Sequence, residues 1–186
     1  MDLTNDISRE PAAAQLRART RGQHEAVDAL YSRYDLGTCG SYGEFLQAQY
    51  RAVAAAEKAL KAFPALPTWR QRADLVATDL RSLGIPLPVP LSIDLLSSPA
   101  RAHGLLYVTE GSRLGGRLLL RAVADDLPTR FLEDGHHPGE WRRLLAACDQ
   151  FANEHTGAIE DMLAGAEAGF HLFAEAAVVT VPGAAR

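Results

Sequence analysis

The stretch that decides the fold runs from Ala102 to Ala122 and reads AHGLLYVTEGSRLGGRLLLRA. Its apolar residues recur at spacings of three and four, and no proline interrupts them, so the pattern predicts a helix. The same stretch carries four glycines, each of which costs about 1 kcal/mol relative to alanine inside a helix. At roughly 100° per residue, Gly104, Gly111 and Gly115 fall within about 40° of one another. The expected helix therefore has one bare stripe along its length.

The bare stripe can face either a neighbouring helix or a flat ligand. Small residues let another backbone approach closely, and the same stripe would let a planar molecule lie against the helix. Four charged residues lie on the opposite side and are predicted to face water: Glu110, Arg113, Arg117 and Arg121. The stretch alone does not decide between a packing seam and a ligand surface.

The composition places the chain among soluble globular proteins, with 47% hydrophobic and 23% charged residues. Its 186 residues fit one domain over positions 1–186, whose ends at 1–8 and 181–186 are expected to fray. A net charge of −4 gives no electrostatic case for binding nucleic acid or an anionic membrane. Cys39 and Cys148 show no metal-binding spacing and are expected to be free thiols. Neither a secretory signal nor an apolar run of about 18 residues is visible, so a cytoplasmic location is predicted.

Hydrophobic periodicity and capping residues predict an all-α protein, a bundle of six to seven helices. Three alternate prolines make residues 85–91 an extended connector rather than a strand, because they remove backbone donors. A polar turn is expected at 133–139, where His136 and His137 would be exposed. The expected helices cover approximately residues 9–31, 41–62, 68–83, 98–127, 139–155 and 158–179.

His24 interrupts the apolar face of the first expected helix. A histidine on such a face is usually a satisfied core residue, and the alternative is a ligand for a metal or cofactor. Asp28 follows one turn later, where its carboxylate can accept the imidazole N–H and fix the tautomer. Arg17 lies two turns earlier and is positioned to meet an anionic group. His171, on the last expected helix, is the weaker candidate ligand of the two.

Several common catalytic motifs are missing from the sequence. It contains no GxxxxGK[ST] phosphate loop and no glycine fingerprint preceded by a strand. The Gly-x-Ser-x-Gly elbow is also absent. A di-iron bundle needs Glu-x-x-His on two helices, and the match from Glu133 to His136 falls in the expected turn. Phosphate-loop chemistry, serine hydrolysis and di-iron chemistry are therefore not expected.

Three segments together resemble the heme oxygenase family. The segment 16–24, LRARTRGQH, resembles the proximal helix, with Thr20 four residues and Arg17 seven residues before His24. The segment 107–116, YVTEGSRLGG, resembles the distal helix, and 168–175, AGFHLFAE, resembles the last helix. The resemblance spans nearly the whole chain. It is nearest to the bacterial branch of the family that is associated with phytochrome chromophore supply.

The resemblance implies an enzyme for which heme is both cofactor and substrate. In this family, dioxygen and external electrons cleave heme to biliverdin, carbon monoxide and ferrous iron. The implied partners are dioxygen, an electron donor such as a ferredoxin or a flavoprotein reductase, and a phytochrome that accepts the bilin. Neither nucleic acid nor a membrane is an implied partner.

The resemblance also assigns site residues on the two faces of the heme. His24 would bind the iron through Nε2, Asp28 would hold the other ring nitrogen, and Arg17 would meet a propionate. The glycine stripe would lie against the opposite face. The residues expected to be catalytic are His24, Gly111, Ser112 and Gly115. The other expected heme contacts are Thr20, Val27, Tyr107, Val108, Leu119, Phe170 and Phe173.

Ser112 departs from the family pattern, in which an aspartate commonly follows the distal glycine. A serine hydroxyl can hold a water, but it carries no charge and reaches less far. The last expected helix also offers no basic residue for a second propionate. These two departures keep a non-catalytic heme-binding or heme-sensing protein on the same fold as the alternative. A related helical enzyme that acts on a cofactor without iron and a purely structural bundle also stay open.

Overall fold

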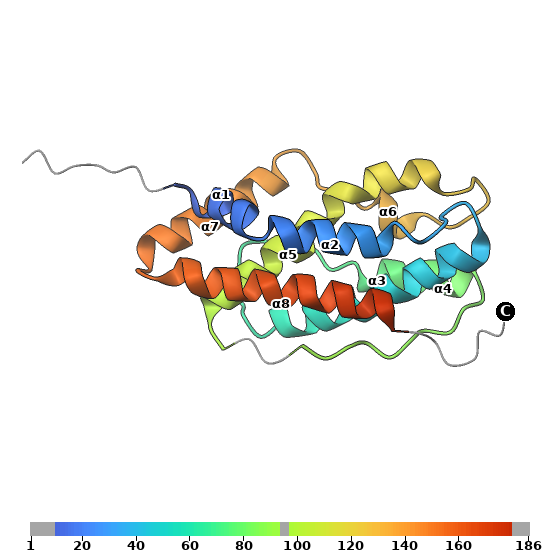
Figure 1. Ribbon diagram of the computed structural model, residues 1–186, viewed down its shortest axis with the longest axis horizontal. Coiled ribbons are helices and arrows are strands. Elements are labelled where there is room, and N and C mark those ends of the chain that lie inside the picture. The colour runs from blue at the N-terminus through green and yellow to red at the C-terminus, as the bar shows by residue number, and fades with distance from the viewer. Residues whose placement is uncertain (1–9, 94–96, 180–186) are drawn as a thin grey trace, which may run out of the picture.

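The computed structural model describes residues 10–93 and 97–179, and over these ranges the protein is helical without any strand (Figure 1). The segments expected to fray, 1–8 and 181–186, lie outside the described residues. The prediction of an all-α protein is confirmed. The described helices are α1 (Ala12–Arg19), α2 (Arg21–Tyr31), α3 (Cys39–Leu60), α4 (Ala73–Ser82), α5 (Pro99–Leu119), the 3-10 helix η1 (Leu120–Ala122), α6 (Arg130–Glu133), α7 (Glu140–Glu154) and α8 (Ala158–Val178).

The centre of the fold is the crossing of α5 and α8, which make the most extensive contact of any helix pair described. Two glycines make this crossing possible. A Cβ atom on Gly104 would overlap the carbonyl oxygen of Met162, and one on Gly165 would overlap that of Arg101. Only glycine lets two backbones approach this closely. At Gly104 the bare stripe of α5 is therefore a packing seam.

Gly104→Ala is expected to lower the free energy of unfolding by about 3 kcal/mol or more, because the added methyl group must push two backbones apart. Gly115→Ala is the matched control, since a Cβ atom there would meet nothing within 4 Å. This second substitution should raise stability by up to about 1 kcal/mol, the difference in helix propensity. Urea denaturation measures both effects. Equal effects of the two substitutions would contradict this account of the crossing.

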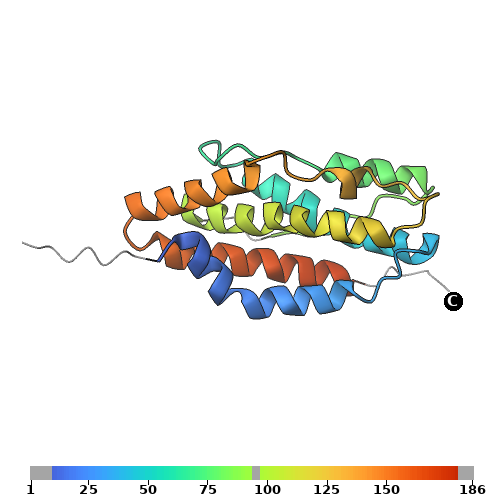
Figure 2. The same cartoon turned by 90° about the horizontal axis from the view of Figure 1, so that it is seen from above.

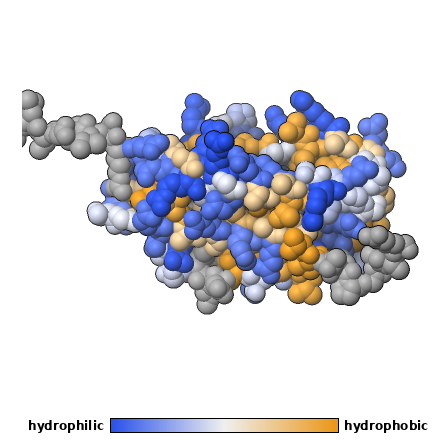
Figure 3. Space-filling view, viewed as in Figure 1, coloured by the Kyte–Doolittle hydropathy of each residue, from blue (hydrophilic) through white to orange (hydrophobic). Residues whose placement is uncertain are grey.

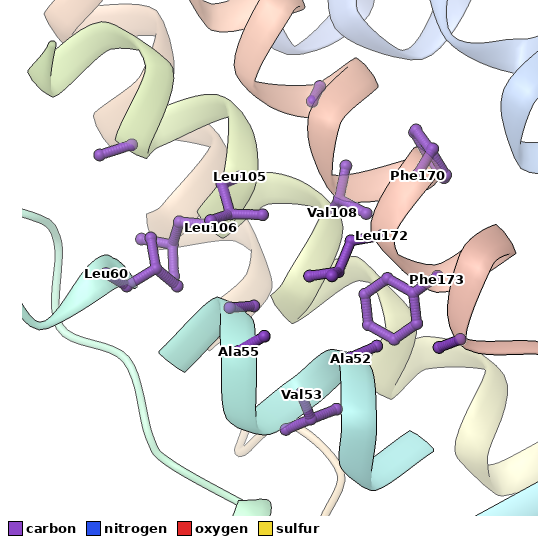
Figure 4. Close-up of a cluster of buried hydrophobic side chains, with 14 of the residues drawn as sticks. Ala52, Val53, Ala55, Leu60, Leu105, Leu106, Val108, Phe170, Leu172 and Phe173 are labelled. Atoms are coloured by element: carbon purple, nitrogen blue, oxygen red, sulfur yellow. The ribbon is translucent and has the colours of Figure 1, made fainter. Parts of the chain in front are cut away.

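The hydrophobic core lies between α3, α5 and α8 (Figure 4). Its side chains in that view include Ala52, Val53, Ala55 and Leu60 of α3, Leu105, Leu106 and Val108 of α5, and Phe170, Leu172 and Phe173 of α8. Each of these residues is at most 7% exposed. Three of the expected heme contacts, Val108, Phe170 and Phe173, thus belong to the core that holds α5 against α8.

The first expected helix is in fact two helices, because the chain bends at Thr20. α1 ends at Arg19 and α2 begins at Arg21, while Thr20 itself has φ −102° and ψ 8°. The Thr20 hydroxyl donates to the carbonyl oxygen of Leu16 at 2.7 Å, a bond that bends helices. The bend lets α1 pack on α7 while α2 packs on α8. Apolar periodicity predicts both segments but does not reveal the bend.

The helix expected from residue 68 begins instead at Ala73. The backbone N–H groups of Arg72 and Ala73 donate to Oε1 of Glu57 on α3, at 2.6 and 3.2 Å. A carboxylate from another helix therefore satisfies the first donors of α4, which the local sequence does not show. At α5 the sequence offers Ser97 or Ser98 as the cap, and in the structure the side-chain oxygen of Ser98 accepts from the N–H of Arg101.

Some helices end where the sequence pattern predicts, and others end earlier. α5 stops at Leu119 and η1 continues only to Ala122, whereas periodicity extends the helix to residue 127. The N–H of Val123 bonds to the carbonyl of Leu120 at 3.3 Å, a tight turn that closes the helix. Gly84 ends α4 with φ +69°, as its position predicts. The bounds of α7 and α8 lie within one residue of the expected ranges.

Hydrophobic and hydrophilic side chains are interspersed over the face shown in Figure 3. The most exposed large apolar side chains are Leu87, Val89, Leu114, Leu118 and Val178. Among the described helices, none combines the length and the apolar character needed to cross a membrane.

Candidate functional site

α8 contacts both α2 and α5, and these two helices run along different sides of it (Figure 1 and Figure 2). α2 has no buried residue, even though it carries the apolar residues Val27, Leu30 and Tyr31. The second half of α5 is open in the same way, because Ser112 and Gly115 are exposed. Both helices therefore present surface that their neighbours do not cover.

His24 lies on the uncovered surface of α2. Its side chain is 63% exposed, so it is not the satisfied core histidine that its apolar surroundings in sequence allow. Nδ1 lies 3.1 Å from Oδ2 of Asp28, the residue one turn later. Nε2 has no hydrogen-bond partner among the described residues. The pair therefore leaves Nε2 free to ligate a metal.

Contacts with α8 hold the histidine in place. The ring of Phe170 meets the His24 ring edge-on, with centroids 5.9 Å apart. The Tyr31 hydroxyl donates to the carbonyl oxygen of Phe173 at 3.2 Å, which ties the end of α2 to α8. Val27 is half-buried against the core. Thr20 is buried and its hydroxyl is used within its own helix, so it does not face the uncovered surface.

The three glycines of the α5 stripe have different surroundings. Gly104 packs against α8, as described above. A Cβ atom on Gly111 would lie 3.5 Å from the Trp141 ring of α7, an ordinary contact. A Cβ atom on Gly115 would meet nothing. Leu119, four residues later, is half-buried against the core. The stripe is thus a packing seam at its start and an open surface at its end.

Tyr107 and Arg17 lie at the edge of this open segment. The Tyr107 ring lies 5.6 Å from that of Trp141. Burial raises the pKa of Tyr107 whereas Arg17 lowers it, which places the exposed guanidinium of Arg17 near this tyrosine. α1, which carries Arg17, packs on α7, which carries Trp141. Tyr107 and Gly111 therefore both lie beside the Trp141 ring, and the charge of Arg17 acts on Tyr107.

Two of the four charged residues expected to face water, Glu110 and Arg113, are buried. Arg113 has a fully buried side chain whose Nε lies 3.0 Å from each carboxylate oxygen of Glu110. The same guanidinium donates to the carboxylate of Asp134 and to the carbonyl of Arg70. Glu110 is only 6% exposed. The segment that follows α6 covers this face, while Arg117 and Arg121 are exposed as predicted: Arg117 on α5 and Arg121 on η1.

His136 belongs to the same buried cluster, although an exposed turn was expected there. Its Nε2 lies 3.2 Å from Oε2 of Glu110, and its side chain is 9% exposed. Nδ1 is buried without a partner among the described residues. The ring lies 5.6 Å from that of Trp141. His137 is exposed, as predicted. A cavity of about 440 Å³ adjoins the cluster, lined by Glu110, His136, Arg70, Glu140, Trp69 and Arg143 among others.

His136→Gln is expected to flatten the dependence of stability on pH below neutrality. Burial holds the pKa of His136 below its usual value, despite the opposing effect of Glu110. The unfolded state therefore takes up a proton first as pH falls through about 6.5, and stability present above that pH is lost below it. Urea denaturation between about pH 7.5 and 5.5 should show a steeper loss in the wild type than in the variant. His137→Gln, at an exposed neighbour, should keep the wild-type slope; parallel slopes for all three proteins would contradict the prediction.

Ser112 is held by an arginine that sequence reasoning missed. Nη2 of Arg72 donates to Ser112 Oγ and, at 3.0 Å, to the carbonyl oxygen of Thr109. Ser112 Oγ itself donates to the Thr109 carbonyl at 2.7 Å. Arg72 precedes α4, far from α5 in sequence, and no local pattern singles it out. Only the tertiary fold brings the two side chains together.

No group of three or more His, Cys, Asp or Glu side chains in the described part of the chain could hold a metal ion by itself. Cys39 is exposed and Cys148 buried, and both are free thiols as predicted. Burial raises the pKa of Cys148 to about 12, so this thiol stays protonated. His171 is exposed on α8 and belongs to no such group among the described residues. A metal ion bound to Nε2 of His24 would therefore need another ligand, such as a macrocycle, to supply its remaining coordination bonds.

Two comparisons identify related proteins, while no family model matches the chain. A protein of Xanthomonas campestris pv. campestris (strain 8004) named heme oxygenase is 35% identical over 111 residues. The match covers 56% of this chain and 66% of that protein, just under two thirds of the relative's length. The crystal structure of NO- and CO-bound heme oxygenase from Neisseria meningitidis matches with a TM-score of 0.72 and 25% identity. That alignment covers 94% of this chain and 96% of the other. Since a sequence relative and a solved structure of one family both match, the chain belongs to the heme oxygenase family.

Proposed function

We propose that this protein is a heme oxygenase, which uses dioxygen and external electrons to cleave heme to biliverdin, carbon monoxide and ferrous iron. The observation that carries the proposal is the state of His24. It is exposed on a helix without buried residues, and Asp28 occupies Nδ1 so that Nε2 is free. When bound, heme supplies the iron that takes up dioxygen and the porphyrin carbon that is oxidised.

The residues of α2 and α8 fit a heme on the side of His24. Nε2 of His24 would ligate the iron. Asp28, whose Oδ2 lies 3.1 Å from Nδ1, would accept the N–H there, leave the lone pair on Nε2 and fix the ring direction. The partly buried side chain of Val27 and the Phe170 ring beside His24 would give the porphyrin apolar contacts. The absence of any buried residue on α2 fits a surface that a ligand covers.

α5 and α1 would supply the opposite wall and the rim. The open space at Gly115 allows a flat ligand to approach the backbone, and Gly111 and Leu119 would extend this wall. Ser112, exposed beside Gly115, would accept or donate a hydrogen bond there. Arg17, near Tyr107, would pair with a propionate, for which a guanidinium is well suited. The core residues Val108 and Phe173 would support these walls from behind.

The reaction needs electrons, and the proposed donor is an external ferredoxin or flavoprotein reductase. The proposed recipient of the bilin is a phytochrome, and the proposed location is the cytoplasm. The donor and the recipient rest on the likeness of the segments 16–24, 107–116 and 168–175 to the heme oxygenase family and its phytochrome-associated branch. The location rests on the free thiols of Cys39 and Cys148, which are usual in a reducing compartment.

Aerobic turnover of the heme-loaded protein tests the proposal. Heme is first titrated into the protein, and a reductant is then added in air. We expect the Soret band to disappear while a broad absorption of biliverdin grows at longer wavelength, with carbon monoxide released. A stable oxygenated complex that is never degraded would indicate a heme-binding or heme-sensing protein instead. Failure to bind heme at all would overturn both functions.

A further inference from the structure

A buried arginine without a carboxylate partner lies behind the open segment of α5. Arg72 is 3% exposed, and within the described ranges no carboxylate oxygen lies within 4.0 Å of its guanidinium nitrogens. Nη2 bonds to the Thr109 carbonyl and to Ser112 Oγ, and Cζ lies 4.8 Å from the centroid of the Phe131 ring. Nε is buried without a partner.

Packing does not explain an arginine at this position. Burial and the nearby charge of Arg113 lower the pKa of Arg72 to about 10, against the opposing effect of Glu110, Glu57 and Asp134, so the group is still a cation at neutral pH. A buried cation without an ion partner is costly, and an apolar side chain of similar volume would fill the space at lower cost. What the guanidinium adds is its pair of bonds to α5, one of which ends on Ser112.

The bonds of Arg72 leave the Ser112 hydroxyl free to turn. A hydroxyl has one proton to donate, and that of Ser112 goes to the Thr109 carbonyl at 2.7 Å. The same carbonyl also accepts from Arg72 at 3.0 Å. If the hydroxyl rotates toward the open side, Thr109 keeps one hydrogen bond and no acceptor is left unsatisfied. Donation from Arg72 to Ser112 Oγ polarises the O–H bond and makes it a stronger donor.

We propose that Arg72 is a positioning residue that holds Ser112 Oγ at the distal wall and makes its hydroxyl a donor to an anionic ligand on that side of the heme. The proposal rests on the heme oxygenase function proposed above. It assigns the polar contact on that side to an uncharged serine and to a buried arginine that immediately precedes α4. Arg72 acts through Ser112 and does not itself touch the ligand.

Azide binding to the ferric heme-loaded protein tests this pair. Azide is anionic and accepts hydrogen bonds, whereas carbon monoxide on the ferrous heme is neutral and a poor acceptor. We expect Arg72→Met to weaken azide binding by about tenfold or more, the effect of losing a charge-assisted hydrogen bond, and to leave carbon monoxide affinity unchanged. Ser112→Ala should have a similar effect. In the Ser112→Ala background, Arg72→Met should add little. Arg51→Met is the control, since Arg51 on α3 is also buried, at 7% exposure.

Each result supports or overturns the proposed roles of Arg72 and Ser112. An azide affinity of Arg72→Met equal to that of Arg51→Met overturns the proposal, as do fully additive effects of Arg72→Met and Ser112→Ala. If Arg72→Met does not fold, Ser112→Ala decides alone, because Ser112 is exposed and its loss should leave the fold intact. An unchanged azide affinity in Ser112→Ala then overturns the proposal. A wild-type protein that shows no Soret band on heme titration would overturn the proposed function instead.

Discussion

His24→Ala is expected to reduce heme turnover by at least about a hundredfold, because even the partners of metal ligands are each worth roughly 10- to 100-fold. The side chain is 63% exposed, and its Nδ1 lies 3.1 Å from Oδ2 of Asp28. The free energy of unfolding should therefore change by no more than about 0.5 kcal/mol. The variant stays folded, so a loss of turnover can be attributed to the loss of the iron ligand. Asp28→Asn, which keeps an acceptor but removes the charge, should cost about tenfold.

Heme titration followed by reductant in air measures these effects on ligation and turnover. His171→Ala is the matched control, since His171 is an exposed histidine on α8. It should keep the wild-type spectrum and rate. Added imidazole should restore part of the wild-type spectrum in His24→Ala, because the removed ring leaves room for it. A wild-type spectrum in His24→Ala without imidazole would exclude this histidine as the iron ligand.

Arg113→Met is expected to lower the free energy of unfolding by about 3–5 kcal/mol, the usual cost of breaking a buried ion pair from one side. The guanidinium is fully buried and bonds to the carboxylates of Glu110 and Asp134 and to the carbonyl of Arg70. Its removal leaves the Glu110 carboxylate without an arginine beside it and Asp134 with only Arg70. Methionine fills most of the volume of the arginine side chain. The lost stability therefore measures the effect of the missing charge and not that of a cavity.

Chemical denaturation of Arg113→Met beside Arg117→Met isolates the effect of burial. Arg117 stands one turn later on the same helix and is exposed, so its loss should change stability by no more than about 0.5 kcal/mol. Adding Glu110→Gln to Arg113→Met should recover part of the loss, because it removes one of the stranded charges. Equal stabilities of the two single variants would show that the Arg113 ion pairs do not form.

The parts of the site that could be predicted from the sequence depend on neighbours along the chain. His24 and Asp28 are one turn apart, so any helix through both brings them together, and the structure has Nδ1 and Oδ2 at 3.1 Å. The Ser98 cap and the ranges of α7 and α8 were predictable for the same reason. The glycines of α5 were visible as a stripe, but not which part of the stripe is packed and which is open.

The sequence by itself determined the helical class, the order of the main helices and the pairing of His24 with Asp28. Tertiary structure alone decided the bend at Thr20, the burial of the charged face of α5 and the bond from Arg72 to Ser112. Helical periodicity shows which side chains share a face of one helix, but it carries no information on what covers that face. Arg113 meets a carboxylate 21 residues away and Ser112 an arginine 40 residues away, and these approaches are set by the packing of the whole bundle.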